Sequence, residues 1–299
     1  MKSSINEKGR SLARSARHTW EIPLVIFSAV LTVFFYVLSF SLSVLAQEGK
    51  FAGDILRILF NVSSNYSGIV LRWGALIIFL FLLYSTVLLA YYNLSYKGMC
   101  YSRSVKLPES KYKILNEMYL DLAEKAGIEN PPPVYIASED NPKTIIGIPV
   151  LSSRAICIDD DVVRSAIVSG DTREVEYCLL RKLAAISLGH CSFINQFLTL
   201  CIKYIPVFRG LLYRSMCYSV DRFVKLVLGS EFIIRNIIET SYNLDDYEED
   251  ADSFAELRRS AMSKDEQFAS SAENLAGNVP VPIFRIQALL NDSRSGRLL

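Results

Sequence analysis

The sequence predicts a mostly helical α+β protein, in which a hairpin of two transmembrane helices precedes a cytoplasmic domain with a small β-sheet. Hydrophobic residues make up 51% of the 299 residues, and the excess is concentrated near the N-terminus. From about Ser104 the composition becomes that of a globular domain. Apolar residues there recur mainly at helical spacing, and two short β-type segments interrupt them.

Two apolar stretches are long enough to cross a bilayer, which requires about 20 residues in a helix. The first predicted transmembrane helix covers residues 23–46 and carries no charge. The second covers residues 69–92 and contains Arg72 near its start, from where a long side chain reaches the membrane interface. A signal peptide is the alternative for the first stretch, but the apolar core is too long and a second span follows at once.

Basic residues are concentrated outside this hairpin. Five lie in the basic tail, residues 1–22, and five lie between Lys97 and Lys113. The intervening loop, residues 47–68, has two basic and two acidic residues. The positive-inside rule therefore predicts an integral membrane protein with both termini in the cytoplasm and an external loop. Two short Asn-x-Ser patterns in this loop carry little weight.

After the hairpin we expect a linker over residues 93–110, a folded domain over 111–290 and a flexible tail over 291–299. The domain is predicted to begin with a helix that ends at Gly127. Short strands follow in "NPPPVYIAS" and "AICIDDDVV", and Asp171 with Glu174 forms a cap signature before the helix "EVEYCLLRKLAAISLGH". Residues 221–238 predict a further amphipathic helix.

Residues 193–212 are apolar but contain Lys203, Pro206 and Arg209. This composition makes a poor third span and favours a helix or hairpin that is buried in the fold or lies in the interface.

Several classes of function have no support in the composition or motifs. The net charge of +1 gives no reason to expect a nucleic-acid partner. The six cysteines are scattered without a C-x-x-C pair, which is not typical of a disulfide framework. The acidic run around residues 244–252 lacks the spacing of a calcium loop and predicts a solvated loop or helix start. Glycine-rich phosphate-binding motifs do not occur.

The order of the elements resembles the HtpX-type membrane zinc endopeptidases. The resemblance consists of two N-terminal spans followed by "LAEKAGI", "PPPVYIA", "NPKTIIG", "AICIDDDVV", a capped helix and "YRSMCYSVDRF". It covers roughly residues 107–229 and the membrane hairpin, and it depends on order and spacing because no single motif is intact. It implies a degenerate metallopeptidase domain and a bacterial inner membrane as the location.

The resemblance also identifies the positions where the family holds its zinc. There, two histidines of an H-E-x-x-H helix bind the metal, the glutamate is the general base, and a later glutamate is the third protein ligand. The corresponding residues of this sequence are Arg181, Lys182, Ala185 and Cys217. Arginine offers only donors and alanine offers no ligand atom, so we expect the family's zinc and its hydrolysis to be lost, leaving no cofactor and no catalytic residue.

Four residues are candidates for binding: Lys182, His190, Cys217 and Asp221. The favoured interpretation of Lys182 is that its side chain extends out of a shallow groove to solvent. The alternative is that Lys182 or Arg181 pairs with a carboxylate where the metal would sit, namely Asp221. His190 is the one histidine expected in a folded site because His18 lies in the tail. With Cys217 it suggests a cysteine nucleophile, but nothing in the sequence places the two within hydrogen-bond reach.

The predicted function is a membrane-anchored, catalytically inactive metallopeptidase homologue, a pseudopeptidase. It would bind a protein partner or an unfolded polypeptide segment, or form part of a membrane assembly. In the family an edge strand pairs with extended substrate, and "VYIAS" or "AICID" are candidate edges. The alternatives are an active zinc metalloendopeptidase with a rebuilt metal site, and a structural membrane protein whose spans carry its function. Expected partners are the lipid bilayer and a polypeptide.

Overall fold

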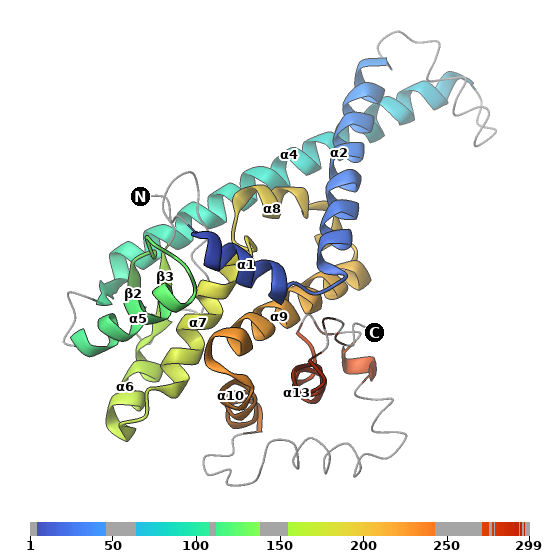
Figure 1. Ribbon diagram of the computed structural model, residues 1–299. Coiled ribbons are helices and arrows are strands. Elements are labelled where there is room, and N and C mark those ends of the chain that lie inside the picture. Colours follow the sequence, from blue (N-terminus) through green and yellow to red (C-terminus); the bar gives the residue numbers. More distant parts are fainter. Residues whose placement is uncertain are drawn as a thin grey trace.

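Two long helices, α2 (Glu21–Leu45) and α4 (Ser64–Arg103), extend from the rest of the molecule and pack against each other (Figure 1). They belong to a mostly helical fold with a three-stranded sheet. The computed structural model describes residues 5–45, 64–107, 112–137, 155–242, 271–274, 277, 279–292, 294 and 296.

Each long helix contains a stretch that is long and apolar enough to cross a membrane. These stretches are Glu21–Ser41 in α2 and Trp73–Tyr91 in α4, and only 17% of each is buried. Large side chains such as Val30 and Ile77 are each 63% exposed. The helices therefore differ from core helices of a soluble domain, which bury most of their apolar surface.

The helix α4 is longer than the predicted span. It continues to Arg103 and leads directly into the strand β1 (Ser104–Lys106). The predicted linker over residues 93–110 is therefore largely regular structure. The helix continues beyond its apolar residues, because the backbone hydrogen bonds of a helix also form where the side chains are polar.

From Ile5 onwards the predicted basic tail, residues 1–22, is also structured, which corrects the expectation that it lies outside the folded domain. Its helix α1 (Glu7–Ala16) begins at Asn6, whose side chain accepts a hydrogen bond from the Gly9 backbone at 3.0 Å. Ala13 and Ala16 are buried in the main hydrophobic core. The N-terminal segment is thus part of the folded domain, where α1 contacts α7 and α9.

The sheet has the order β1-β2-β3, with β1 antiparallel and β3 parallel to β2. The predicted strands are present as β2 (Val134–Ala137) and β3 (Ile156–Asp159). Because β2 is central, "VYIAS" is not an edge, and among the described residues β3 pairs on one side only. The Ile156 backbone donates to Pro133 at 2.9 Å, so the alternate residue Cys157 directs its backbone groups away from β2.

The helix α7 (Arg173–Ser187) lies at the centre of the domain (Figure 1). Its buried leucines contact neighbours on several sides, because α5, α6, α9, α10, α1 and β3 all pack against it. The surrounding helices are α5 (Lys113–Lys125), α6 (Asp160–Ser169), α9 (Pro206–Leu228), α10 (Ser230–Tyr242) and α13 (Pro282–Leu290). The helix predicted over residues 221–238 is divided at Gly229, whose φ of 94° ends α9.

The apolar segment 193–212 forms α8 (Phe193–Leu198), the 3₁₀ helix η2 (Cys201–Tyr204) and the first turns of α9. Polar side chains of the long helices hold this segment. Ser28 and Thr32 of α2 donate to the Leu198 carbonyl at 3.1 and 3.0 Å, and Tyr204 donates to Ser85 of α4 at 2.7 Å. The segment therefore lies beside the apolar stretches of both long helices.

Three predicted features lie outside the described residues. They are the Asn-x-Ser pattern at Asn61, the segment "NPKTIIG" over residues 141–147, and the acidic run over 244–252. The second Asn-x-Ser pattern, at Asn65, lies in the first turns of α4, which begins within the predicted external loop.

Candidate functional site

Helices α7 and α9 bring together the residues that correspond, by the resemblance, to the metal positions of the HtpX-type family. Arg181 and Ala185 lie on α7, and Cys217 and Asp221 lie one turn apart on α9. The Arg181 guanidinium donates to the Cys217 sulfur at 3.5 Å and lies 3.6 Å from an Asp221 oxygen. The alternative interpretation, in which Arg181 pairs with Asp221, is therefore confirmed.

The stronger partner of Asp221 is a residue that the sequence did not reveal. Arg285 of α13 contacts both carboxylate oxygens, with Nε at 2.6 Å from Oδ2 and Nη2 at 2.8 Å from Oδ1. Such bidentate pairs combine charge with two well-oriented hydrogen bonds. Asp221 is only 1% exposed. A signal for this contact exists in "PIFRIQALL", because an arginine within an apolar helix needs a buried partner.

The tyrosine Tyr177 connects the two arginines. Its hydroxyl accepts from Arg285 at 2.9 Å and from Arg181 at 3.2 Å. We name Tyr177, Arg181, Cys217, Asp221 and Arg285 the Arg-Asp cluster. Burial alone would raise the pKa of Asp221, but the two arginines outweigh it and hold this pKa below its ordinary value. The cluster therefore has two guanidinium charges and one carboxylate at neutral pH.

These residues do not fit a zinc ion. Arg181 offers donors only, Ala185 has no ligand atom, and Asp221 already accepts from Arg285. Burial, with the nearby Asp221 charge, raises the pKa of the Cys217 thiol, so a thiolate ligand is disfavoured. Across the described part of the chain, no group of three or more His, Cys, Asp or Glu side chains is placed to hold a metal.

Lys182 does not extend to solvent, so the favoured interpretation of this residue is wrong. It is 4% exposed, and its ammonium group donates to the Cys157 carbonyl of β3. That carbonyl faces away from β2 and would otherwise be an acceptor at the sheet edge. Lys182 therefore bridges α7 and the edge of β3. The carbonyl accepts one hydrogen bond from the buried ammonium group, which has three N–H donors.

His190 and Cys217 do not form a nucleophile pair. His190 lies beyond the end of α7, and its Nε2 is 3.1 Å from Oε1 of the buried Glu21. Glu21 also contacts Arg17 at 2.5 Å and accepts from Ser219. These contacts attach the start of α2 to α9 and to the turn after α7.

His18 is part of the folded domain, contrary to the expectation that only His190 would be. It is 3% exposed and its ring stacks on Tyr218 at a centroid distance of 5.6 Å. The Trp20 backbone donates to its Nδ1 at 3.2 Å, so this nitrogen is unprotonated.

A cavity of about 750 Å³ lies over the Arg-Asp cluster. Residues of α4, α7, α8, η2 and α9 contribute to its wall, and Arg181, Ala185, His190 and Cys217 are among them. Three cations, Arg181, Lys203 and Arg209, line it, and none of the described lining residues is Asp or Glu. The wall is therefore positively charged, with apolar side chains between the cations.

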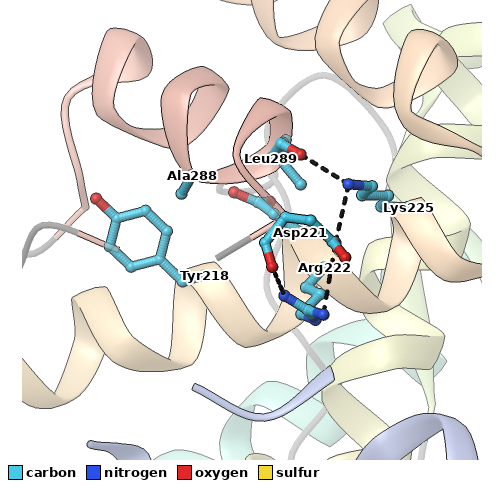
Figure 2. A pocket seen from close by; sticks show the side chains of 7 residues that line it. Tyr218, Asp221, Arg222, Lys225, Ala288 and Leu289 are labelled. Carbon is cyan, nitrogen blue, oxygen red and sulfur yellow. Dashed lines mark hydrogen bonds and ion pairs between the residues drawn. The ribbon is translucent and has the colours of Figure 1, made fainter. Parts of the chain in front are cut away.

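Side chains on the side of α9 that faces away from this cavity hold α13 in place. Figure 2 shows Lys225 and Arg222 of α9 directed at the end of α13. Lys225 donates to the Leu289 carbonyl at 2.7 Å and to Asp292 at 3.0 Å, and Arg222 donates to the Asp292 carbonyl at 2.9 Å. The cavity drawn there is about 10 Å³, room for about one water. These contacts position Arg285, and they show that Asp292 of the predicted flexible tail is held.

Comparisons with protein-family models, with curated proteins and with solved structures find no match for this chain.

Proposed function

We propose that this chain is a membrane-anchored, catalytically inactive protein with HtpX-like architecture, and that it acts as a protein-binding or scaffold component of a membrane assembly. The observation that carries the proposal is the Arg-Asp cluster. Two arginines neutralise the buried Asp221 between α7 and α9, where the resembled family binds zinc. The cluster carries excess positive charge, which repels a divalent cation.

The binding surface that we propose is the edge of β3 that pairs with no strand among the described residues. Alternate residues of this strand direct backbone groups away from β2, and an extended polypeptide can add to such an edge through main-chain hydrogen bonds. Binding of this kind needs no metal. Lys182 occupies the Cys157 carbonyl in the free protein, so an incoming strand would displace it.

The test combines metal content with binding, using the full chain in mild detergent. Zinc is measured by elemental mass spectrometry. A fluorescent, reduced and unfolded polypeptide reports binding by anisotropy and cleavage by gel electrophoresis, with and without a chelator. We expect zinc well below one per chain and binding without cleavage. Stoichiometric zinc with chelator-sensitive cleavage would establish the active metalloendopeptidase instead. Absence of both cleavage and binding would favour the structural alternative.

Lys182→Met tests the location of binding. The variant removes the lysine from the Cys157 carbonyl, so that an incoming strand can bind there. We expect affinity for the unfolded polypeptide to rise about fivefold, which corresponds to the free energy of one hydrogen bond, about 1 kcal/mol. Lys125→Met is the matched control because Lys125 is exposed on α5. Loss of binding in Lys182→Met would mean that the lysine itself contacts the polypeptide, and the edge assignment would be wrong.

A further inference from the structure

The cavity over the Arg-Asp cluster has cations that the cluster does not neutralise. Arg181 shares the single carboxylate of Asp221 with Arg285, and Lys203 and Arg209 have no carboxylate within ion-pair distance among the described residues. The Nε atom of Arg209 is buried and has no hydrogen-bond partner in that part of the chain. Burial also lowers the pKa of Lys203. Both side chains are partly buried, and a partly desolvated cation is stabilised when an anion contacts it.

Lys203 lies close to the apolar stretch of α4. Tyr204, next to Lys203, donates to Ser85, which lies six residues before Tyr91, the end of the apolar stretch of α4. Six helical residues span about 9 Å. Leu89 of the same stretch lines the cavity. If α4 crosses a membrane, Lys203 therefore lies near the lipid headgroups at that end of the helix.

The surface around the cavity is suited to contact lipid. Ile194 is 70% exposed, Tyr204 52% and Val207 49%. These side chains belong to α8, η2 and the start of α9, a segment that packs against α2 and contacts α4 through Tyr204. An uncovered apolar surface next to a spanning helix is favourable in acyl chains and unfavourable in water.

We propose that this cavity binds the headgroup of an anionic phospholipid, with Lys203 and Arg209 contacting the phosphate. Apolar lining residues of α4 and α9, among them Leu89, Leu212 and Met216, would contact the upper part of an acyl chain. The volume of about 750 Å³ is sufficient for a headgroup and adjoining methylenes. The site goes beyond the proposed polypeptide binding, although it depends on the membrane anchoring of that proposal.

Two features favour a lipid over a polypeptide here. The residues that line the cavity come from helices and their connections, with no residue of β3, so no strand edge is available for main-chain pairing. Anionic lipids are also concentrated in the cytoplasmic leaflet, the side on which the charge pattern places this domain.

The experiment is a lipid competition on the full chain in non-ionic detergent micelles. Phosphatidylglycerol and phosphatidylcholine with identical acyl chains are added in equimolar amounts, and native mass spectrometry counts the lipids retained. We expect each chain to retain one phosphatidylglycerol and to prefer it over phosphatidylcholine by at least about tenfold. Two cations that contact an anionic headgroup contribute enough binding free energy for this preference. The double variant Lys203→Gln, Arg209→Gln should lose this preference.

The matched control is Lys125→Gln, Arg164→Gln, which removes the same charge from exposed positions on α5 and α6. Circular dichroism checks that both double variants are folded. Equal loss of preference in the control would mean nonspecific charge attraction and would overturn the proposal. Equally tight binding of glycerol 3-phosphate would assign the cavity to a soluble anion. Binding of fluorescent oligoglutamate in place of lipid, dependent on Lys203, would assign it to an acidic peptide.

Discussion

Asp221 depends on two arginines that differ in their contacts. Arg285 is buried and makes two short hydrogen bonds to it, whereas Arg181 is 31% exposed and lies 3.6 Å away. Removing one partner of a buried pair leaves an uncompensated charge and costs roughly 3–5 kcal/mol, whereas a partly exposed pair contributes up to about 1 kcal/mol. The two arginines therefore make unequal contributions to stability.

We predict that Arg285→Met lowers the free energy of unfolding by about 3 kcal/mol or more and that Arg181→Met lowers it by less than about 1 kcal/mol. Urea titration of the chain in mild detergent, followed by circular dichroism, measures both. The variant Arg285→Met, Asp221→Asn should regain part of the loss because no buried charge is left unpaired. Equal effects of the two single variants would contradict the assignment.

His18 makes stability depend on pH. Burial lowers its pKa, because the hydrogen bond to Gly296 and the charge of Glu21 only partly offset desolvation. The unfolded state therefore takes up a proton at higher pH than the folded state, and stability falls as the pH drops through the ordinary histidine value of about 6.5. Above that value the contribution of His18 is fully present.

We predict that His18→Asn flattens this dependence below about pH 6.5, where one proton changes stability by up to about 1.4 kcal/mol per pH unit. Asparagine keeps an acceptor for the Trp20 backbone but does not titrate. Urea titrations at several pH values compare the two chains. Identical slopes in both would mean that His18 does not contribute.

At the level of elements, α1 is attached to the domain by a close backbone contact. A Cβ atom on Gly9 would lie 2.8 Å from the Gly127 carbonyl oxygen and 2.9 Å from that of Ala126. The Asn6 backbone donates to the same Gly127 carbonyl at 3.0 Å. Main-chain atoms move less readily than side-chain ends, so only glycine fits at position 9.

We predict that Gly9→Ala destabilises the domain by about 1–3 kcal/mol, as overpacking does, and increases proteolysis near α1. Gly74→Ala is the matched control because a Cβ atom there meets nothing within 4 Å. It lies in a helix, where alanine is the better residue, so we expect no loss. If both variants behaved alike, α1 would not be held by this contact.

Local patterns predicted some elements and missed others for physical reasons. The spans, α5, α7 and the two predicted strands have large apolar residues at regular spacing. The helix α1 buries Gly9, Ala13 and Ala16, which carry little hydrophobic signal. The helix α6 was not predicted, although Asp159 caps it and Asp160 and Asp161 begin it, where carboxylates favour a helix N-terminus.

At the scale of the whole molecule, the sequence predicted only part of the Arg-Asp cluster. Asp221 could be predicted as a partner of Arg181 because the resemblance placed α7 beside α9. Arg285 is 64 residues further along the chain than Asp221. Its role depends on how α13 packs against the domain. Tertiary contacts, such as the hydrogen bond from Lys225 to the Leu289 carbonyl, determine this packing. Local patterns carry no information about such pairings.

The N-terminal and C-terminal segments meet on α9. Arg222 donates to the Ser15 carbonyl at 3.1 Å and to the Asp292 carbonyl at 2.9 Å, and the Thr19 backbone donates to Arg294 at 3.1 Å. If α2 and α4 cross a membrane, these contacts require both segments to lie on one side of it. Figure 1 shows α1 and α13 with the domain, away from the far end of the long helices.

We therefore predict that both ends of the chain face the cytoplasm and that the segment between α2 and α4 is external, as the distribution of basic residues indicates. A fluorescent protein that matures only in the cytoplasm should fluoresce at either terminus of the full chain. Alkaline phosphatase, active only outside, should be active when fused after Leu56 and inactive when fused after Leu299. Ends on opposite sides would contradict the packing of both segments on α9, and phosphatase activity at the C-terminus would reverse the orientation. In that reversed case Lys203 and Arg209 would face the leaflet with fewer anionic lipids, and the phosphatidylglycerol site would lose its main supply of ligand.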